Sequence, residues 1–223
     1  MQKKRGQSIK RRWVRWWRQL RKTYRRFIRK SGAGAKIALI GLVVILGVVM
    51  YNGFSAPKVD PSAYGLLMQT IAKGESNGNY NAYFGNAGNT DVRFTEMSIA
   101  EVVSWQQTQI ANGSASSAVG KYQIVRPTLL GLVDELDVDT SDTFDAALQD
   151  RFAIALMERR GALEYVQKKL SREQFAANLA KEWAALPKVL GPNPTESYYA
   201  SDGINNSQIS IAEVYGALKQ LES

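Results

Sequence analysis

The sequence of 223 residues contains no histidine and no cysteine. Without cysteine there is no disulfide framework, no thiol nucleophile and no cysteinyl metal site. Without histidine there is no Ser-His-Asp triad, no imidazole base and no ordinary zinc enzyme. Any chemistry must therefore use carboxylates, hydroxyls, amides, Lys, Arg or Tyr, and we expect neither a metal nor a cofactor.

Acidic residues are also absent from the N-terminal part of the chain. Residues 1–36 carry 15 Lys and Arg, whereas residues 60–223 carry 13 basic residues against all 20 acidic ones, a net charge of −7. The formal net charge of +9 is thus an average over two different pieces. This asymmetry argues against treating the whole protein as a cationic nucleic-acid binder.

A long apolar run follows the basic segment. Residues 37–51 carry no charged or strongly polar side chain, but as a helix they cover only about 22 Å of a hydrocarbon core about 30 Å thick. Residues 33–54 would cover about 33 Å, with the Lys36 amine able to reach the interface. The pattern predicts one uncleaved transmembrane signal anchor. The alternatives are a buried helix of a soluble domain and a cleaved signal peptide.

The charge asymmetry then predicts the topology. Positive charge stays inside, so residues 1–32 form a cytoplasmic arm and residues 55–61 link the anchor to an exported, periplasmic or extracytoplasmic domain of residues 62–223. Alternatively, the chain belongs to the internal membrane of a phage virion. The arm has two possible partners besides the lipid bilayer it abuts: anionic lipid, or DNA bound through phosphate contacts and aromatic stacking.

The exported domain has the pattern of a mostly helical protein. Capping boxes, a proline in a first turn and glycines after apolar periods mark the helix ends. The predicted helices cover residues 63–73, 98–111, 127–136, 144–160, 171–186 and 210–221. Residues 80–95 instead alternate Asn, Gly and aromatics, which predicts a short hairpin or an ordered loop. The expected fold class is therefore α+β with one small sheet.

Glu75 is the first candidate for catalysis. It follows the end of the first predicted helix, which we expect to stop at Gly74. The negative end of the helix dipole should raise the pKa of this carboxyl, as a general acid at neutral pH requires. Taken alone, however, a Glu at a helix end is more often a solvated surface residue.

A second segment, SSAVGKYQIVRPT, adds groups suited to a sugar. Gly120 lets a ligand approach the backbone, Gln123 offers an amide, and Tyr122 offers a stacking face with a hydroxyl. The alternative is an ordinary turn before a helix that starts at Pro127.

Four collinear segments across about residues 63–200 resemble the phage lambda lysozyme family of peptidoglycan lytic transglycosylases, within the lysozyme-like superfamily. Glu75 lies where that family has its single acidic catalyst. SSAVGKYQ is similar to the family's small-residue loop before Gly-Arg-Tyr-Gln, with Lys121 in place of Arg. SDTFDAALQDRFAIALMERRGAL resembles its long amphipathic helix, and FAANLAKEWAALP, with Trp183, resembles its Trp-Ala-x-Leu-Pro segment.

The resemblance implies a lysozyme-like fold with a small β-hairpin region. It implies that Glu75 cleaves the MurNAc-GlcNAc β-1,4 bond of peptidoglycan strands as general acid and then base. The predicted membrane tether suits phage penetration of the host or local opening of the wall. The substrate-binding residues expected from the resemblance are Ser76, Tyr80, Gly120, Lys121, Tyr122, Gln123, Trp183 and Tyr198.

Two other functions remain open on the sequence. A muramidase would need a second carboxylate, for which Asp91 and Glu96 are candidates, because Glu101 is better explained as the capping partner of Ser98. A catalytically silent glycan-binding membrane scaffold would use the same cleft without forming product.

Overall fold

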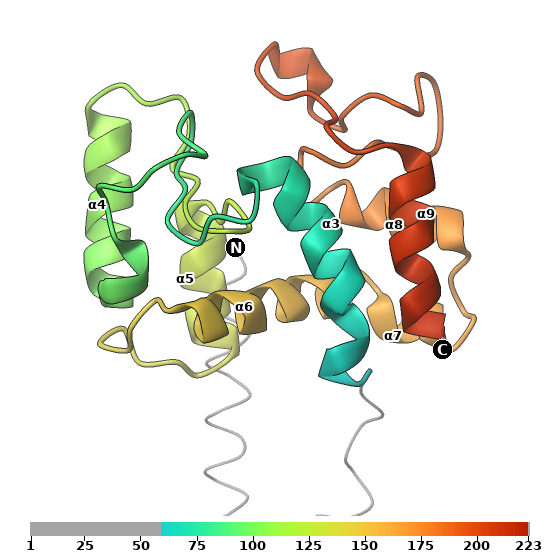
Figure 1. Ribbon diagram of the computed structural model, residues 1–223, viewed down its shortest axis with the longest axis horizontal. Helices are drawn as coiled ribbons and strands as arrows, with labels where there is room; N and C mark the ends of the chain where they lie inside the picture. The colour runs from blue at the N-terminus through green and yellow to red at the C-terminus, as the bar shows by residue number, and fades with distance from the viewer. Residues whose placement is uncertain (1–58, 223) are drawn as a thin grey trace, which may run out of the picture. The chain divides into compact units, whose positions relative to one another are not determined.

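The computed structural model describes residues 59–222 (Figure 1). The described residues form one compact unit. The predicted arm of residues 1–32 and the predicted anchor of residues 33–54 lie outside the described residues. Within residues 59–222, no helix has both the length and the apolar character needed to cross a membrane.

The unit is built almost entirely from helices. The α-helices are α3 (Gly65–Ser76), α4 (Ile99–Ala111), α5 (Arg126–Glu135), α6 (Ala146–Arg159), α7 (Ala162–Val166), α8 (Arg172–Leu179) and α9 (Ile211–Leu218). Four short 3₁₀ helices are η1 (Pro61–Tyr64), η2 (Phe94–Glu96), η3 (Ala200–Asp202) and η4 (Lys219–Glu222).

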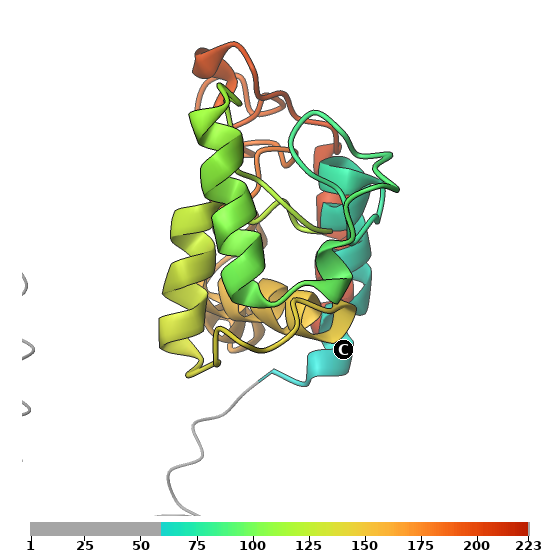
Figure 2. The same ribbon diagram turned by 90° about the vertical axis from the view of Figure 1, so that its left-hand side faces the viewer.

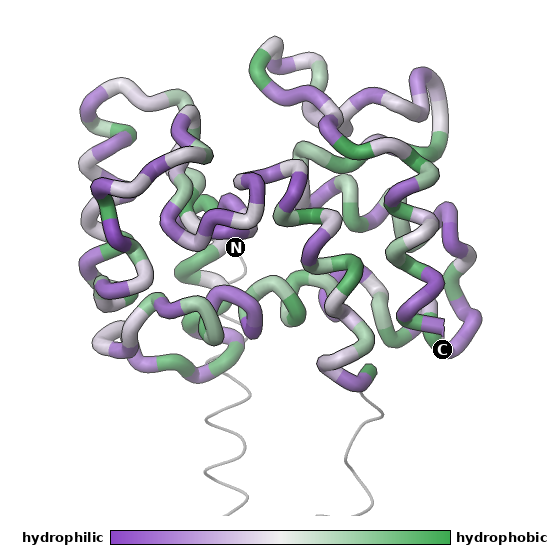
Figure 3. The backbone as a smooth tube through the Cα atoms, viewed as in Figure 1, coloured by the Kyte–Doolittle hydropathy of each residue, from purple (hydrophilic) through white to green (hydrophobic). Residues whose placement is uncertain are grey.

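The helices form two halves joined by α6. Helices α4 and α5 contact each other, and α3 and α8 both contact α9. Figure 1 shows α6 running along the base of both halves, and Figure 2 shows α4 and α5 standing side by side. Polar and apolar residues alternate along the helices in Figure 3, as expected when each helix buries one face. The largest fully buried side chains are Tyr64, Phe94, Tyr122, Phe144, Phe152 and Phe175.

Local sequence signals fix most helix starts. The three predicted capping boxes, at Ser98, Ser171 and Ser210, are all formed. In the first, the Glu101 carboxylate accepts the Ser98 N–H at 2.7 Å, so Glu101 is the capping partner that the sequence predicts. Pro127 lies in the first turn of α5.

The first helix does not stop at Gly74. Helix α3 continues through Gly74 and Glu75 to Ser76, and Asn77 then closes it with a φ of 52°. Gly74 is required for packing, because a Cβ there would lie 2.7 Å from the Ala185 Cβ. Glu75 therefore lies in the last turn of the helix and not after it.

Helix α8 is shorter than predicted. It ends at Leu179, and the N–H groups of Glu182 and Trp183 both bond to the Leu179 carbonyl in a tighter turn. The chain is thereby redirected before Pro187. The backbone N–H of Ala185 becomes available to Glu75 instead of a helical carbonyl.

The expected small sheet is reduced to isolated bridges. Residues 59–222 contain no strand longer than a bridge, and Tyr83 pairs with Asn86 and Val119. Asparagine side chains replace the missing ladder: the Asn89 amide donates to the Val92 carbonyl at 2.7 Å, and Asn81 accepts the Thr95 N–H at 2.9 Å. Residues 80–95 thus form the ordered loop and not the hairpin. The mostly helical expectation is confirmed and is consistent with a lysozyme-like fold.

Candidate active site

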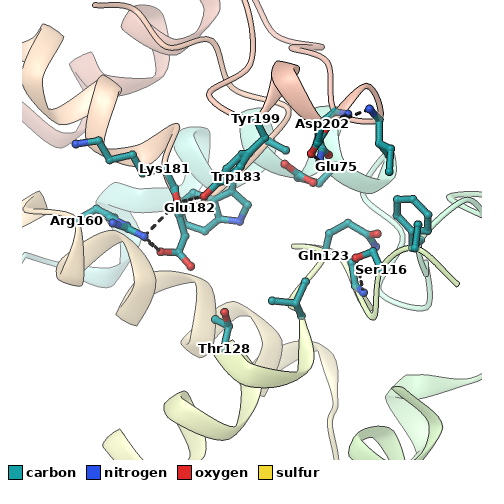
Figure 4. Close-up of a pocket in the computed structure, with 17 residues that line it drawn as sticks. Glu75, Ser116, Gln123, Thr128, Arg160, Lys181, Glu182, Trp183, Tyr199 and Asp202 are labelled. Carbon is teal, nitrogen blue, oxygen red and sulfur yellow. Dashed lines mark hydrogen bonds and ion pairs between the residues drawn. The ribbon is translucent and has the colours of Figure 1, made fainter. Parts of the chain in front are cut away.

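A cleft of about 470 Å³ opens between the end of α3, the loop before α5 and the chain after α8. Figure 4 shows Glu75, Ser116 and Gln123 toward one end and Arg160, Lys181 and Glu182 toward the other. Aromatic surface comes from Phe84, Trp183 and Tyr199. The size and the mixture of apolar and polar groups are typical of a site for a small molecule or a short polymer segment.

Glu75 lies at this cleft with one hydrogen bond to its carboxyl group. The Ala185 N–H donates to Glu75 Oε1 at 2.9 Å, and no Lys or Arg of residues 59–222 forms an ion pair with it. Burial raises the Glu75 pKa to about 7, and the Ala185 hydrogen bond only partly opposes this. The direction agrees with the sequence analysis, and the largest cause is burial, which the sequence analysis did not invoke.

Two further carboxylates line the cleft, and both are tied to partners. Glu182 binds Arg160, with Nη2 and Nε at 2.6 Å and 2.8 Å from the carboxylate. Asp202 accepts the Asn205 and Ile204 N–H groups, each at 2.9 Å, and these bonds lower its pKa. Glu75 is thus the carboxyl group of this cleft with the properties of a general acid near neutral pH.

Asp91 and Glu96, the second carboxylates considered from the sequence, do not line the cleft. Both are exposed, and Glu96 pairs with Arg93 at 3.5 Å. Their loop is held together by the hydrogen bonds of Asn81 and Asn89. Within residues 59–222, no group of three or more Asp and Glu side chains is arranged to hold a metal ion.

Of the substrate-binding residues expected from the sequence, Gln123 and Trp183 line the cleft with Glu75. Gln123 has a φ of 48°, and its amide donates to the Gly120 carbonyl at 2.9 Å. Gly120 itself has a φ of 78°, and an added Cβ would collide with the Gln149 side chain. Gly120 is therefore needed for the turn and does not line the cleft.

Three other expected residues form a polar cluster against α6. The Tyr122 hydroxyl donates to Asp150 at 2.7 Å, and the Tyr80 hydroxyl lies 2.9 Å from the same carboxylate. Lys121 Nζ lies 2.9 Å from the Tyr80 hydroxyl and 3.4 Å from Asp150. Tyr80, Lys121 and Tyr122 thus brace the loop from behind, and none of them lines the cleft.

Ser76 and Tyr198 also lie off the cleft lining. Ser76 is 1% exposed, and its hydroxyl donates to the Lys121 carbonyl at 2.7 Å, which joins the end of α3 to the loop. Tyr198 is exposed beside the cleft, and the adjacent Tyr199 takes the lining position.

Two buried glutamines hold the loop of residues 116–125 in place. The Gln106 amide donates to the Ser117 and Ile124 carbonyls at 2.7 Å and 2.9 Å. Gln149 accepts the Lys121 N–H at 2.9 Å and donates to the Tyr80 carbonyl at 3.1 Å. This wall of the cleft is fixed by hydrogen bonds from α4 and α6.

Most of the other residues that line the cleft were not expected from the sequence. They include Phe84, Arg160, Glu182, Tyr199 and Asp202. Of these, only Asp202 lies in a recognisable local pattern. The sequence Asp-Gly-Ile-Asn-Asn from Asp202 is typical of a turn that an Asp side chain organises. The pairing of Arg160 with Glu182 depends on how α6 meets the chain after α8, which no local pattern specifies.

A mostly helical domain whose cleft presents one carboxyl group with a raised pKa, beside acids held by partners, has the features expected of an acid-catalysed glycan-cleaving protein. The family model described as Endolysin matches residues 66–201, more than half of the chain, and the chain belongs to the endolysin family of phage peptidoglycan-degrading enzymes. The match includes Glu75 and most of the cleft. No curated protein and no solved structure matches the chain.

Proposed function

We propose that the protein is a membrane-anchored lytic transglycosylase that cleaves the MurNAc-GlcNAc β-1,4 bond with Glu75 alone. The Glu75 carboxyl proton passes to the glycosidic oxygen as the C1–O bond breaks. The resulting Glu75 carboxylate then accepts the proton of the sugar's own 6-hydroxyl as that oxygen bonds to C1. Glu75 is thereby reprotonated, no water is consumed, and the product is a 1,6-anhydro sugar.

The observation that carries this proposal is the contrast among the carboxyl groups of the cleft. Burial raises the Glu75 pKa to about 7, so a large fraction is protonated at neutral pH. Glu182 is bound to Arg160, and both oxygens of Asp202 accept hydrogen bonds within their own turn. A one-carboxylate mechanism needs only the remaining carboxyl group of the cleft, that of Glu75.

Product analysis tests the proposal directly. Purified sacculi are incubated with the full chain, and the released muropeptides are analysed by mass spectrometry, with Glu75→Gln as the control for contaminating activity. We expect 1,6-anhydro ends from the wild type and none from Glu75→Gln. Reducing-end muramic acid from the wild type would contradict the transglycosylase.

Asp202 supports the competing function, a two-carboxylate muramidase, because it is an acidic group on the same cleft as Glu75. In that mechanism, Asp202→Asn would abolish release and the products would carry reducing ends. In the proposed mechanism, Asp202→Asn weakens the turn of residues 202–205 but leaves anhydro products.

The membrane topology is proposed from the charge pattern of the chain. Residues 33–54 anchor the protein, residues 1–32 face the cytoplasm or a packaged genome, and the catalytic domain faces the wall. The absence of cysteine makes single-cysteine labelling clean. An impermeant thiol reagent should label Ser141→Cys but not Ser8→Cys in intact membranes, and the reverse pattern would refute the topology.

Anchoring restricts the enzyme to openings close to its membrane, which suits penetration of the host by a phage or another local opening of the wall. The arm carries 14 Lys and Arg in residues 1–32. Contact with DNA or with anionic lipid through this arm should weaken steeply as salt increases, and a binding assay with increasing salt tests it.

A further inference from the structure

Asp150 on α6 binds side chains from two separate loops. Its carboxylate accepts the Tyr80 hydroxyl at 2.9 Å and the Tyr122 hydroxyl at 2.7 Å, and Lys121 Nζ lies 3.4 Å away. The Lys121 ammonium also lies over the Tyr80 ring, 4.5 Å from its centroid. Asp150 does not line the cleft with Glu75. Any effect that Asp150 has on the reaction must therefore pass through other residues.

Lys121 depends on the charge of Asp150. The Lys121 side chain is only 15% exposed, and Asp150 is the carboxylate that pairs with it within residues 59–222. An ammonium group with so little access to water is costly without an anion beside it. Asp150 itself is 34% exposed, so the pair lies at the edge of the core. Without the carboxylate, Lys121 should move toward solvent and displace the turn that carries it.

The backbone of Lys121 joins this cluster to the end of α3. Its carbonyl accepts the Ser76 hydroxyl at 2.7 Å, and its N–H donates to the Gln149 side chain at 2.9 Å. Lys121 also lines a shallow hollow with Asn77, which closes the helix. Ser76 is the last residue of α3 and directly follows Glu75. The position of Lys121 thus bears on the position of the helix end that carries Glu75.

The same turn also reaches the cleft. It runs from Gly120 to Gln123 and is closed by the Gln123 N–H, which bonds to the Gly120 carbonyl at 3.2 Å. Gln123 lines the cleft together with Glu75. Burial is the largest cause of the raised Glu75 pKa. A displaced turn would admit water beside Glu75 and would reduce this effect of burial.

We propose that Asp150 is a positioning residue for the reaction, which acts through Lys121 to hold the turn of residues 120–123 against the end of α3 and to keep water away from Glu75. This inference rests on the proposed function, since it takes Glu75 as the general acid. A residue that only stabilised the fold would lower the melting temperature on substitution and leave the Glu75 pKa unchanged.

The Glu75 pKa in the folded protein tests the inference. The glutamate carboxyl carbons of the ¹³C-labelled full chain are followed by NMR through a pH titration, in the wild type and in Asp150→Asn. This variant keeps the shape of the side chain and an acceptor for Tyr122, but it leaves Lys121 unpaired. We expect the Glu75 midpoint to fall from about 7 to about 6 or lower. Glycan release at pH 7 should fall about fivefold, as the protonated fraction does.

Two further variants isolate the route through Lys121. Asp145→Asn makes the same change of charge on the same helix, at an exposed residue that caps α6, and should leave the Glu75 midpoint near 7. The double variant Asp150→Asn, Lys121→Met removes the unpaired ammonium together with its partner and should recover most of the midpoint. Circular dichroism verifies that each variant is folded.

The other charged groups that line the cleft with Glu75 stay in place in all of these variants. They are Arg160, Lys181, Glu182 and Asp202. A change in the Glu75 midpoint therefore reports on the turn and on the Asp150 cluster, and not on the loss of a charge from the cleft.

Three results would overturn the inference. The first is a Glu75 midpoint near 7 in Asp150→Asn, even with a lower melting temperature, because Asp150 would then serve stability alone. The second is an equal fall in Asp145→Asn, which would indicate an effect of charge at a distance. The third is a double variant whose midpoint stays at the Asp150→Asn value. Failure of the proposed function is seen separately, as a wild-type chain that releases no anhydro product although the Asp150→Asn midpoint shifts as expected.

Discussion

Glu75 and Glu182 are the same residue type in one cleft, and the fold gives them opposite surroundings. Glu182 receives two nitrogens of Arg160, at 2.6 Å and 2.8 Å. Glu75 receives one backbone N–H, and burial raises its pKa to about 7. Burial without a cationic partner therefore gives Glu75 the raised pKa that a general acid at neutral pH requires.

The contrast arises from how two helices end. Helix α3 carries Glu75 in its last turn, where the packing of Gly74 against Ala185 and Ile209 draws the chain after α8 over the carboxyl group. Arg160 follows α6, and its side chain reaches Glu182 in the turn after α8. The chain after α8 therefore covers Glu75, and it also carries Glu182, which forms an ion pair with Arg160.

The largest expected difference between the two residues is in activity. Glu75→Gln removes the proton donor and should lower glycan release by about 10²- to 10⁴-fold. Glu182→Gln removes a charge-paired group and should lower release less than about tenfold, through weaker packing of the cleft wall. Release of soluble fragments from dye-labelled sacculi measures both. Similar losses of glycan release in the two variants would show that Glu75 and Glu182 do not differ in their importance for activity.

The pH dependence should follow Glu75. Its protonated form donates to the leaving oxygen, so kcat/KM should fall as the pH rises through about 7. A short soluble glycan measured from pH 3 to 9 gives the profile without interference from the charge of the wall. A falling limb between pH 4 and 5 would mean that Glu75 is an ordinary solvated carboxyl group.

Stability should respond to Glu75 with a definite sign. The folded-state pKa of about 7 lies above the unfolded value near 4.5, so this group's favourable contribution is complete below pH 4.5 and is lost as the pH rises through 7. Glu75→Gln should therefore stabilise the fold at pH 8 by on the order of 2–3 kcal/mol and have little effect at pH 4. Urea unfolding at both pH values tests this, and destabilisation at pH 8 would contradict it.

Removing the partner of Glu182 should have a smaller effect of opposite sign. Arg160→Gln leaves the Glu182 side chain, which is 10% exposed, without its guanidinium partner. We expect a loss of about 2 kcal/mol in the free energy of unfolding, because a charged hydrogen-bonding group stays buried. The double variant Arg160→Gln, Glu182→Gln should recover part of this loss. Additive losses would show that the two side chains do not depend on each other.

Local patterns predicted the helix starts well because the signals are local. The Ser98, Ser171 and Ser210 caps need only residues within one turn. The predicted ends of α3 and α8 were wrong because contacts between segments distant in sequence decide where these helices end. The packing of Gly74 against Ala185 is one such contact. In the same way, burial at Glu75 was not readable from its neighbours, although the direction of its pKa shift was.

Residue type alone misplaced part of the site. Tyr80, Lys121 and Tyr122 have groups suited to a sugar, but Asp150 on α6 draws all three behind the loop. Tyr199 and Asp202 reach the cleft because the segment after Pro187, distant in sequence from Glu75, forms part of its wall. A polar side chain can bind either ligand or protein, and only the tertiary arrangement decides which.

The most direct test of this account is the pKa of Glu75 in the folded protein. The side-chain carboxyl carbons of ¹³C-labelled glutamate are followed by NMR across a pH titration, and Glu75→Gln identifies the Glu75 signal by its absence. We expect a midpoint of about 7 for Glu75. A midpoint near 4.5 would show that the group is ionised at neutral pH and would contradict its role as the general acid.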